Sequence, residues 1–290
     1  MPVLDVVPEL VLLIGGVVVL LYALFAPRRW QGGAAVLALI VLFATAAVTV
    51  PTIGDPQFLT FFSTYAVDDS AIWAKLMILG VTAVIVLLCV DWFREDQRHG
   101  ELYALVLFSA LGAVMLAGAA DLMEIILGAL LASTAGYALA GFHRRSRHAA
   151  EAAIKYYLLG GLANGGMLYG AVLLFGLAGS TTLSALAIST PTADALPLAA
   201  GVALVLVGLT FKIGAVPAHA WMPDVADGSP APAAAFLLAV PKIGAFIAIA
   251  RLMAVMPDAA IGWRPLVAVL AAATMTLGNL ACLWQDDIRR

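Results

Sequence analysis

Long apolar runs, separated by short polar segments, repeat along the whole chain. Each run holds about twenty residues and is continuously apolar, without strict alternation between apolar and polar positions. Such a run predicts an α-helix that crosses a membrane, because about twenty residues at 1.5 Å per residue span a hydrocarbon core of roughly 30 Å. Strands of a membrane barrel alternate instead, so the pattern favours helices.

The runs predict nine transmembrane helices. Their ranges are 8–26, 33–51, 70–91, 101–119, 121–142, 152–178, 194–216, 230–255 and 264–284. The first run lacks a basic preceding segment and a small-residue cleavage site, so we interpret it as a mature helix and not as a signal peptide. The polar interruptions are too short to fold alone. The predicted fold class is therefore all-α, a polytopic bundle of transmembrane helices.

Composition agrees with a membrane protein. Of the 290 residues, 63% are hydrophobic and 11% are charged, and the mean hydropathy is +1.04. A soluble domain needs a polar surface that this composition does not supply. Cys89 and Cys282 both lie in apolar runs, so the sequence indicates neither a disulfide framework nor a zinc site.

The arginines are distributed unevenly between the two sides of the predicted bundle. One side carries Arg28, Arg29, Arg94, Arg98, Arg144, Arg145, Arg147, Arg289 and Arg290, and the other carries Arg251 and Arg264. The arginine-rich side is predicted to be cytoplasmic. We therefore expect a multi-pass protein of the cell membrane with its N-terminus outside and its C-terminus inside.

All four lysines fall within predicted spans, whereas the basic residues of the loops are arginines. A lysine desolvated in a helix bundle can lose its proton near neutral pH, which an arginine cannot do. We interpret Lys75, near Asp68 and Asp69, as a side chain that snorkels to the membrane surface. Lys155 opens its helix, so snorkelling and a functional role are both open for it.

Lys212 and Lys242 lie deeper, at the two ends of FKIGAVPAHAWMPDVADGSPAPAAAFLLAVPK. An unpaired charge inside a membrane costs at least roughly 2.5 to 3.5 kcal/mol, so these two lysines indicate function. Pro217 predicts that the helix of Lys212 breaks. Regular helix is predicted not to resume until about Ala233, because three further prolines intervene, and Pro241 is predicted to kink the next helix.

A broken helix at membrane depth is typical of an ion pathway. His219 and Asp224 add titratable groups to the break, which we expect on the cytoplasmic side. The alternative is a simple turn, because loops between membrane helices are often rich in Pro, Gly and Asp.

These residues resemble a known family. The order F-K, P-A-H-A-W-M-P-D-V, G-S-P-A-P and A-V-P-K is similar to that of the antiporter-like proton-translocating subunits of respiratory complex I. PELVLLIGG, GELYALVLFSALGAVMLAGAADL and EAAIKYYLLGGLANGGMLYG extend the resemblance over the whole chain. Within the family, the likeness is closest to the N-type subunits of bacterial NADH-quinone oxidoreductase.

The resemblance implies roles for individual residues. Lys212 matches the lysine of the broken helix that passes on a proton, and Lys242 matches the lysine that continues the path. His219 matches the histidine of the interrupting loop, on the route from the cytoplasm. Lys155 and Asp224 match a lysine of the preceding helix and the aspartate that closes the loop motif. Quinone reduction elsewhere would then change the electrostatics around the lysines and drive proton transfer.

The resemblance also implies the cofactors and partners. NADH, FMN, iron-sulfur clusters and quinone are expected in partner subunits, with no cofactor or metal in this chain. The expected partners are other membrane-arm subunits, the lipid bilayer and protons, and no nucleic acid. The alternatives are a cation/proton antiporter, a membrane-bound hydrogenase subunit and a structural paralogue that does not pump.

Two departures from the family stand out. In ILGALL, Leu130 occupies the place of a family glutamate, and Glu124 lies six residues earlier, roughly 9 Å along the helix and about 120° around it. The family also continues through a second repeat. We therefore expect a three-helix segment at 1–100, a five-helix proton-translocating repeat at 101–255 and the first helix of a truncated second repeat at 256–290.

Overall fold

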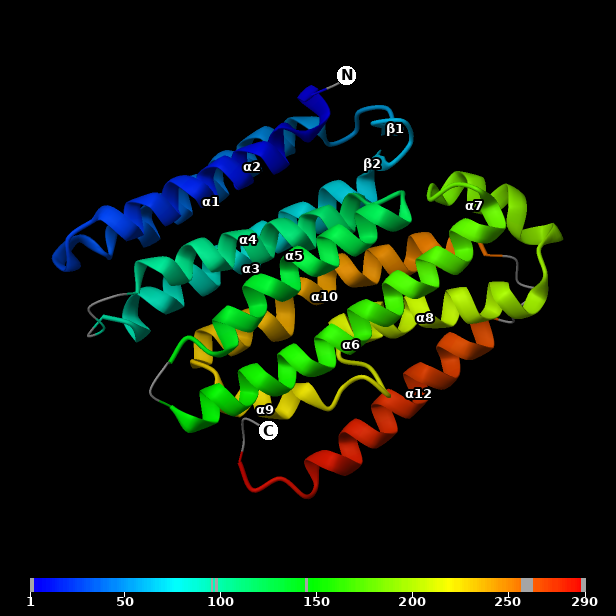
Figure 1. The fold of residues 1–290 in the computed structure, drawn as a ribbon. Coiled ribbons are helices and arrows are strands. Elements are labelled where there is room, and N and C mark those ends of the chain that lie inside the picture. Colours follow the sequence, from blue (N-terminus) through cyan, green and yellow to red (C-terminus); the bar gives the residue numbers. More distant parts are fainter. Residues whose placement is uncertain (1–2, 95, 97–98, 144–145, 257–262, 288–290) are drawn as a thin grey trace.

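The computed structural model describes residues 3–94, 96, 99–143, 146–256 and 263–287 (Figure 1). Among these residues, nine helices are long and apolar enough to cross a membrane, which confirms the prediction. They are α1 (Val7–Phe25), α2 (Gly33–Thr49), α3 (Asp69–Trp92), α4 (Gly100–Gly118), α5 (Leu122–Ala140), α6 (Arg147–Ala178), α8 (Ala195–Ile213), α10 (Ala231–Ala254) and α12 (Trp263–Cys282). The largest difference from the predicted ranges is at α6, which begins at Arg147 instead of 152.

The connections of the bundle gather at two opposite ends. The connections α1–α2, α3–α4 and α5–α6 lie together on the left of Figure 1, and we call this the arginine end, after Arg28, Arg29, Arg94 and Arg147. The N-terminal segment and the strands β1 (Phe58–Thr60) and β2 (Tyr65–Val67) lie at the other, hairpin end. Arg98, Arg144, Arg145, Arg289 and Arg290 lie outside the described residues.

The hairpin end contains structure that the apolar pattern did not predict. β1 and β2 pair antiparallel, with Leu59 opposite Ala66, and Tyr65 forms a further bridge to Ala119. The segment between α6 and α8, predicted as a loop, holds the short helix α7 (Leu183–Ser189) and the 3-10 turn Thr190–Thr192. These pieces hold three to seven residues each, so they are too short to stand out in a search for apolar runs of about twenty residues.

The core lies around α4, which is the most buried of the spanning helices. Helices α1, α3, α5 and α10 all pack against α4. On the other side of the bundle, α6 and α8 approach closely through glycine: a Cβ added to Gly170 would lie 2.6 Å from the carbonyl oxygen of Gly201. Small residues let membrane helices bring their backbones into contact. This close packing places α8, and Lys212 at its end, directly against α6.

The chain breaks after α8 as predicted, but helix resumes earlier than expected. α8 ends at Ile213, and Gly214 adopts a left-handed conformation with φ +71°. A short helix, α9 (Trp221–Gly228), then forms inside the stretch predicted to be irregular, so that part of the prediction was wrong. Pro223 lies in the first turn of α9, where a backbone N–H has no partner within the helix, so proline is tolerated there. α10 continues through Pro241.

Helix α12 lies at the edge of the bundle. None of its described residues is fully buried, and Figure 1 shows it along the lower edge of the bundle. The backbone N–H of Val216, in the break after α8, donates a hydrogen bond of 3.1 Å to Oγ1 of Thr274 in α12. The polar backbone of the break is thus partly satisfied by the neighbouring helix, as membrane depth requires.

Candidate functional site

Lys212 is buried within the bundle and meets a hydroxyl instead of a carboxylate. It lies in the last turn of α8 and only 1% of the residue is exposed. Its Nζ donates a hydrogen bond to Oγ of Ser133, which α5 places opposite. Among the described residues, no carboxylate forms an ion pair with Lys212. The site therefore holds a basic group without a fixed counter-charge, an arrangement that is costly inside a membrane.

Ser133 belongs to a small polar network formed by α5 and α6. Nδ2 of Asn164 lies 3.2 Å from Oγ of Ser133 and 3.4 Å from the hydroxyl of Tyr137. The other amide atom, Oδ1 of Asn164, is buried and has no hydrogen-bond partner among the described residues. A serine hydroxyl accepts from an ammonium group and donates to a neutral amine. The network can therefore contact either protonation state of Lys212.

Aromatic rings close the space between this network and α9. The ring of Tyr156 stacks on Trp221, with 4.4 Å between centroids, and lies 4.8 Å from Tyr137. Nε1 of Trp221 donates a hydrogen bond of 3.1 Å to the carbonyl oxygen of Phe211, the residue before Lys212. Trp221 is fully buried. The rings therefore hold α9 against α6 and against the end of α8.

Lys155 and Asp224, both singled out from the sequence, contact each other. Nζ of Lys155 lies 2.9 Å from Oδ2 of Asp224 and 2.6 Å from Oε1 of Glu151. The Lys155 side chain is 44% exposed, so this is a surface cluster and not a buried pair. It joins the start of α6 to α9.

The structure does not join His219 or Lys242 to this cluster by a hydrogen bond. His219 lies in the turn between α8 and α9, and its Nδ1 is buried without a partner among the described residues. Lys242 is half-buried in α10, which packs against α8, and it makes no ion pair with a described residue. Their roles in a proton path stay predictions.

Glu124 lies at the hairpin end, away from Lys212. It is in the first turn of α5, and its charged neighbours are Asp121 and Glu9. Ser133, the contact of Lys212, is nine residues further along α5, which corresponds to about 14 Å. Leu130, which the resemblance aligns with the family glutamate, is one turn before Ser133 and is 40% exposed, so its side chain faces outward.

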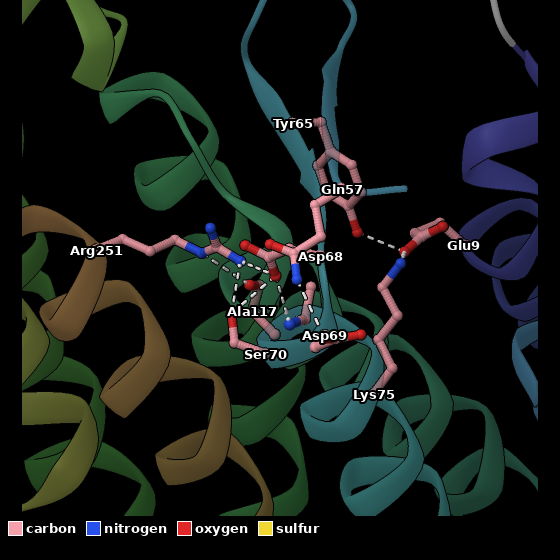
Figure 2. A network of polar contacts seen from close by, with 10 residues as sticks. Glu9, Gln57, Tyr65, Asp68, Asp69, Ser70, Lys75, Ala117 and Arg251 are labelled. Atoms are coloured by element: carbon pink, nitrogen blue, oxygen red, sulfur yellow. Dashed lines mark hydrogen bonds and ion pairs between the residues drawn. The ribbon is translucent and has the colours of Figure 1, made fainter. Parts of the chain in front are cut away.

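Lys75 is a second buried lysine, and the prediction that it snorkels to the membrane surface was wrong. It does not snorkel: only 3% of the residue is exposed, and its Nζ lies 2.6 Å from Oε1 of Glu9 in α1 (Figure 2). The hydroxyl of Tyr65 donates to the same oxygen at 2.5 Å. The partner carboxylate makes burial tolerable, which no property of the α3 sequence reveals. Glu9, a charge inside the first apolar run, was the signal that could have indicated the pair.

Burial and the neighbouring carboxylate of Glu9 both change the pKa of the Tyr65 hydroxyl. Burial raises the pKa of its hydroxyl well above the usual value, and the Glu9 carboxylate raises it further. The hydroxyl therefore stays protonated and acts as a donor to Glu9.

Arg251 and Asp68 form a second group of polar contacts at the hairpin end, beside that of Lys75, Glu9 and Tyr65 (Figure 2). Nη2 of Arg251 lies 2.7 Å from Oδ1 of Asp68, and Nε donates to the carbonyl oxygen of Ala117 at 3.2 Å. Burial alone would raise the pKa of Asp68, but hydrogen bonds from Arg251, the backbone of Ala71 and Ser70 outweigh it, so the pKa is lowered. This network ties the ends of α3, α4 and α10 together.

The family is established by comparison with known proteins. Residues 119–290 match the family described as NADH:quinone oxidoreductase/Mrp antiporter, transmembrane. The chain belongs to this family. The match includes the H-A-W-M-P-D and G-S-P-A-P segments on which the resemblance was based, and it confirms that resemblance.

Similar proteins and solved structures match nearly the whole of this chain. NADH-quinone oxidoreductase subunit N 1 of Streptomyces griseus subsp. griseus is 42% identical over 285 residues, covering 98% of this chain and 60% of the relative. A chain of respiratory complex I from Thermus thermophilus, with bound aureothin, superposes with a TM-score of 0.81 at 32% identity, covering 97% of this chain and 60% of that one. A chain of the Mrp complex from Dietzia sp. DQ12-45-1b has a TM-score of 0.79 at 21% identity, with 98% and 55% covered.

The chain thus spans about 60% of the length of the subunit N relative and of the complex I chain. The likeness to the Mrp chain, at 21% identity, shows the fold alone.

Proposed function

We propose that this multi-pass membrane protein is a membrane-arm subunit of a complex I-type NADH-quinone oxidoreductase and moves protons through buried lysines. The observation that carries the proposal is Lys212, a buried basic group that contacts Ser133 and pairs with no carboxylate of the described residues. A lysine can exchange a proton, whereas an arginine in the same place cannot. Quinone reduction in partner subunits supplies the energy, and NADH, FMN, iron-sulfur clusters and quinone bind there.

The arrangement of the other residues supports a path from the arginine end. Lys155 and Asp224 form a surface cluster at the start of α6, and α9 connects this cluster to the end of α8. His219 lies in the turn between α8 and α9, and its Nδ1 has no hydrogen-bond partner among the described residues. Under this proposal the arginine end lies on the cytoplasmic side of a bacterial inner membrane. Protons reach Lys212 from that side and continue toward Lys242.

The relatives favour this assembly over a cation/proton antiporter. The relative named subunit N shares 42% identity, and the chain from respiratory complex I shares 32%. The Mrp chain shares 21%, so it supports the fold and not the activity.

The test replaces Lys212 in the assembled complex. We expect Lys212→Ala to lose most NADH-driven proton uptake into inverted membrane vesicles, measured with a pH-sensitive dye, while the complex still assembles. Lys212→Arg is expected not to restore uptake, because arginine keeps its proton. Arg147→Gln, which removes an exposed charge at the start of α6, serves as the control and should pump normally.

Two results would contradict the proposal. Normal pumping by assembled Lys212→Ala would show that the lysine only packs. Proton uptake that needs sodium and proceeds without NADH or quinone would assign the chain to the antiporters.

A further inference from the structure

The hydroxyl of Ser133 is directed away from the backbone of its own helix. Elsewhere in the bundle, Thr82 and Thr134 each donate to the carbonyl oxygen four residues earlier, a common way to pair a hydroxyl inside a helix. Ser133 makes no such bond to a described residue, and its Oγ instead contacts Nζ of Lys212 and Nδ2 of Asn164. The hydroxyl is therefore shared between the lysine and the amide.

The side-chain amide of Asn164 is paired at one end only. Nδ2 lies near the hydroxyls of Ser133 and Tyr137, whereas the buried Oδ1 has no hydrogen-bond partner in the described part of the chain. Half a turn of the amide exchanges the two ends, so that Oδ1 faces the hydroxyls and Nδ2 takes the unpaired place. Because one end lacks a partner in either orientation, these contacts do not fix the orientation by themselves.

The protonation state of Lys212 decides which orientation fits. An ammonium group donates to Oγ of Ser133, so the hydroxyl proton needs another acceptor, which Oδ1 of Asn164 supplies once the amide has turned. A neutral amine accepts instead, so Ser133 then donates to Lys212, and its Oγ accepts from Nδ2 of Asn164. The opposite combinations leave a buried donor or acceptor unpaired, which is costly. Each state of the lysine is thus matched by one orientation of the amide.

The packing of α5 on α6 keeps the amide within reach of the hydroxyls. A Cβ added to Gly160, one turn before Asn164, would collide with the hydroxyl of Tyr137, so glycine lets that hydroxyl lie against α6. Tyr137 and Tyr156 are the phenols at this contact, and a phenol is uncharged at neutral pH. Helix α10 packs against α5 and α8 and carries Lys242. The charge that changes beside Ser133 is therefore that of Lys212.

We propose that Asn164 is a positioning residue for proton exchange at Lys212. Its amide turns with the protonation state of the lysine and thereby reverses the hydrogen bond between Ser133 and Lys212. The amide carries no proton itself: it donates through Nδ2 when the lysine is neutral and accepts through Oδ1 when the lysine is charged. This inference rests on the proposed role of Lys212 as a group that gains and loses a proton.

The experiment follows the lysine and the amide by NMR during a pH titration. The full chain is reconstituted in lipid and carries ¹⁵N in the side chains of lysine and asparagine. Asparagine occurs only at positions 164 and 279, and the exposed Asn279 on α12 is a control within the same chain. The signals that disappear in Lys212→Ala and Asn164→Ser identify the two groups.

We expect the amide signal of Asn164 to shift with the same midpoint as the Nζ signal of Lys212. The amide signal of Asn279 should stay constant. In Lys212→Ala the Asn164 signal should also stay constant, because no neighbouring charge then changes.

Proton uptake by the assembled complex tests whether the amide matters for transport. Asn164→Leu should lower NADH-driven uptake about fivefold, the effect of one lost hydrogen bond. Asn164→Ser should lower it less, because a hydroxyl both donates and accepts. Thr134→Val is the matched control and should pump normally, because Thr134 neighbours Ser133 but donates to the carbonyl oxygen of Leu130.

The possible failures are distinguishable. An Asn164 signal that stays constant while Lys212 titrates would overturn the inference and leave the proposed function standing. A shift that follows Lys242, that is equal at Asn279 or that persists in Lys212→Ala would do the same. A Lys212 signal that keeps one protonation state throughout the titration would contradict the proposed function and this inference together.

Discussion

The ammonium group of Lys75 lies 2.6 Å from the carboxylate of Glu9, and the two side chains are only 4% and 11% exposed. The pair connects α3 to α1 across 66 positions of sequence. Removing one member leaves the other charge buried, which typically costs about 3 to 5 kcal/mol, whereas an apolar replacement of the whole pair is often neutral.

This pair gives a stability prediction. Lys75→Met and Glu9→Gln should each lower the melting temperature of the purified chain in detergent clearly, because each leaves an uncompensated buried group. The double variant should recover most of the loss. A double variant that is as unstable as the sum of the two single variants would show that the residues do not act as a pair.

The lowered pKa of Asp68 predicts a dependence of stability on pH. Because the folded pKa lies below the unfolded value of about 3.9, the carboxylate contributes stability that is complete above that value. The contribution is lost as the pH falls through the folded pKa. Asp68→Asn should therefore be less stable than the parent at pH 7, and this difference should shrink in acid.

Asp69→Asn is the control for that measurement, because Asp69 is exposed and, among the contacts drawn in Figure 2, accepts a hydrogen bond only from Gln57. It should follow the parent curve throughout. A difference for Asp68→Asn that is constant with pH would mean that the lost helix cap at Ala71 matters and the charge does not.

We expect loss of the contact between Lys155 and Asp224 to increase the local motion of α9 without lowering the stability of the whole chain. Because Lys155 is 44% exposed, solvent screens the pair, and Asp224→Asn should leave the melting temperature almost unchanged. Hydrogen exchange in α9 should become faster, because the variant loosens the tie between α9 and α6. Unchanged exchange would show that Trp221 alone holds α9 in place.

The proposed orientation predicts which loops react from each side. In a background of Cys282→Ser, which removes the exposed cysteine, we introduce His148→Cys at the arginine end and Ser184→Cys in α7. An impermeant thiol reagent added to intact cells should label position 184 only. Labelling of position 148 from outside would reverse the orientation and the direction of the proposed path.

The sequence by itself determined the membrane spans and the position of the break. The nine apolar runs correspond to the nine helices that, among the described residues, are long and apolar enough to cross a membrane. Length and hydropathy are sufficient to predict them, because a helix in lipid must satisfy its backbone hydrogen bonds within itself. The break at 214–220 followed equally directly, because Pro217 cannot continue α8. The H-A-W-M-P-D motif could indicate the family from the sequence alone, because its residues are contiguous in the chain.

The tertiary structure alone decided the partners of the buried charges. Lys75 and Lys212 look alike in sequence, each a single lysine in an apolar run, yet Lys75 meets Glu9 and Lys212 meets Ser133. These contacts join residues 66 and 79 positions apart, so they depend on which helices pack together and at what rotation. Helix α9 also depends on tertiary contacts: the ring of Trp221 stacks on Tyr156, and its Nε1 donates a hydrogen bond to the carbonyl oxygen of Phe211. Electrostatic interactions depend on distance in space, and a sequence specifies that distance only through the fold.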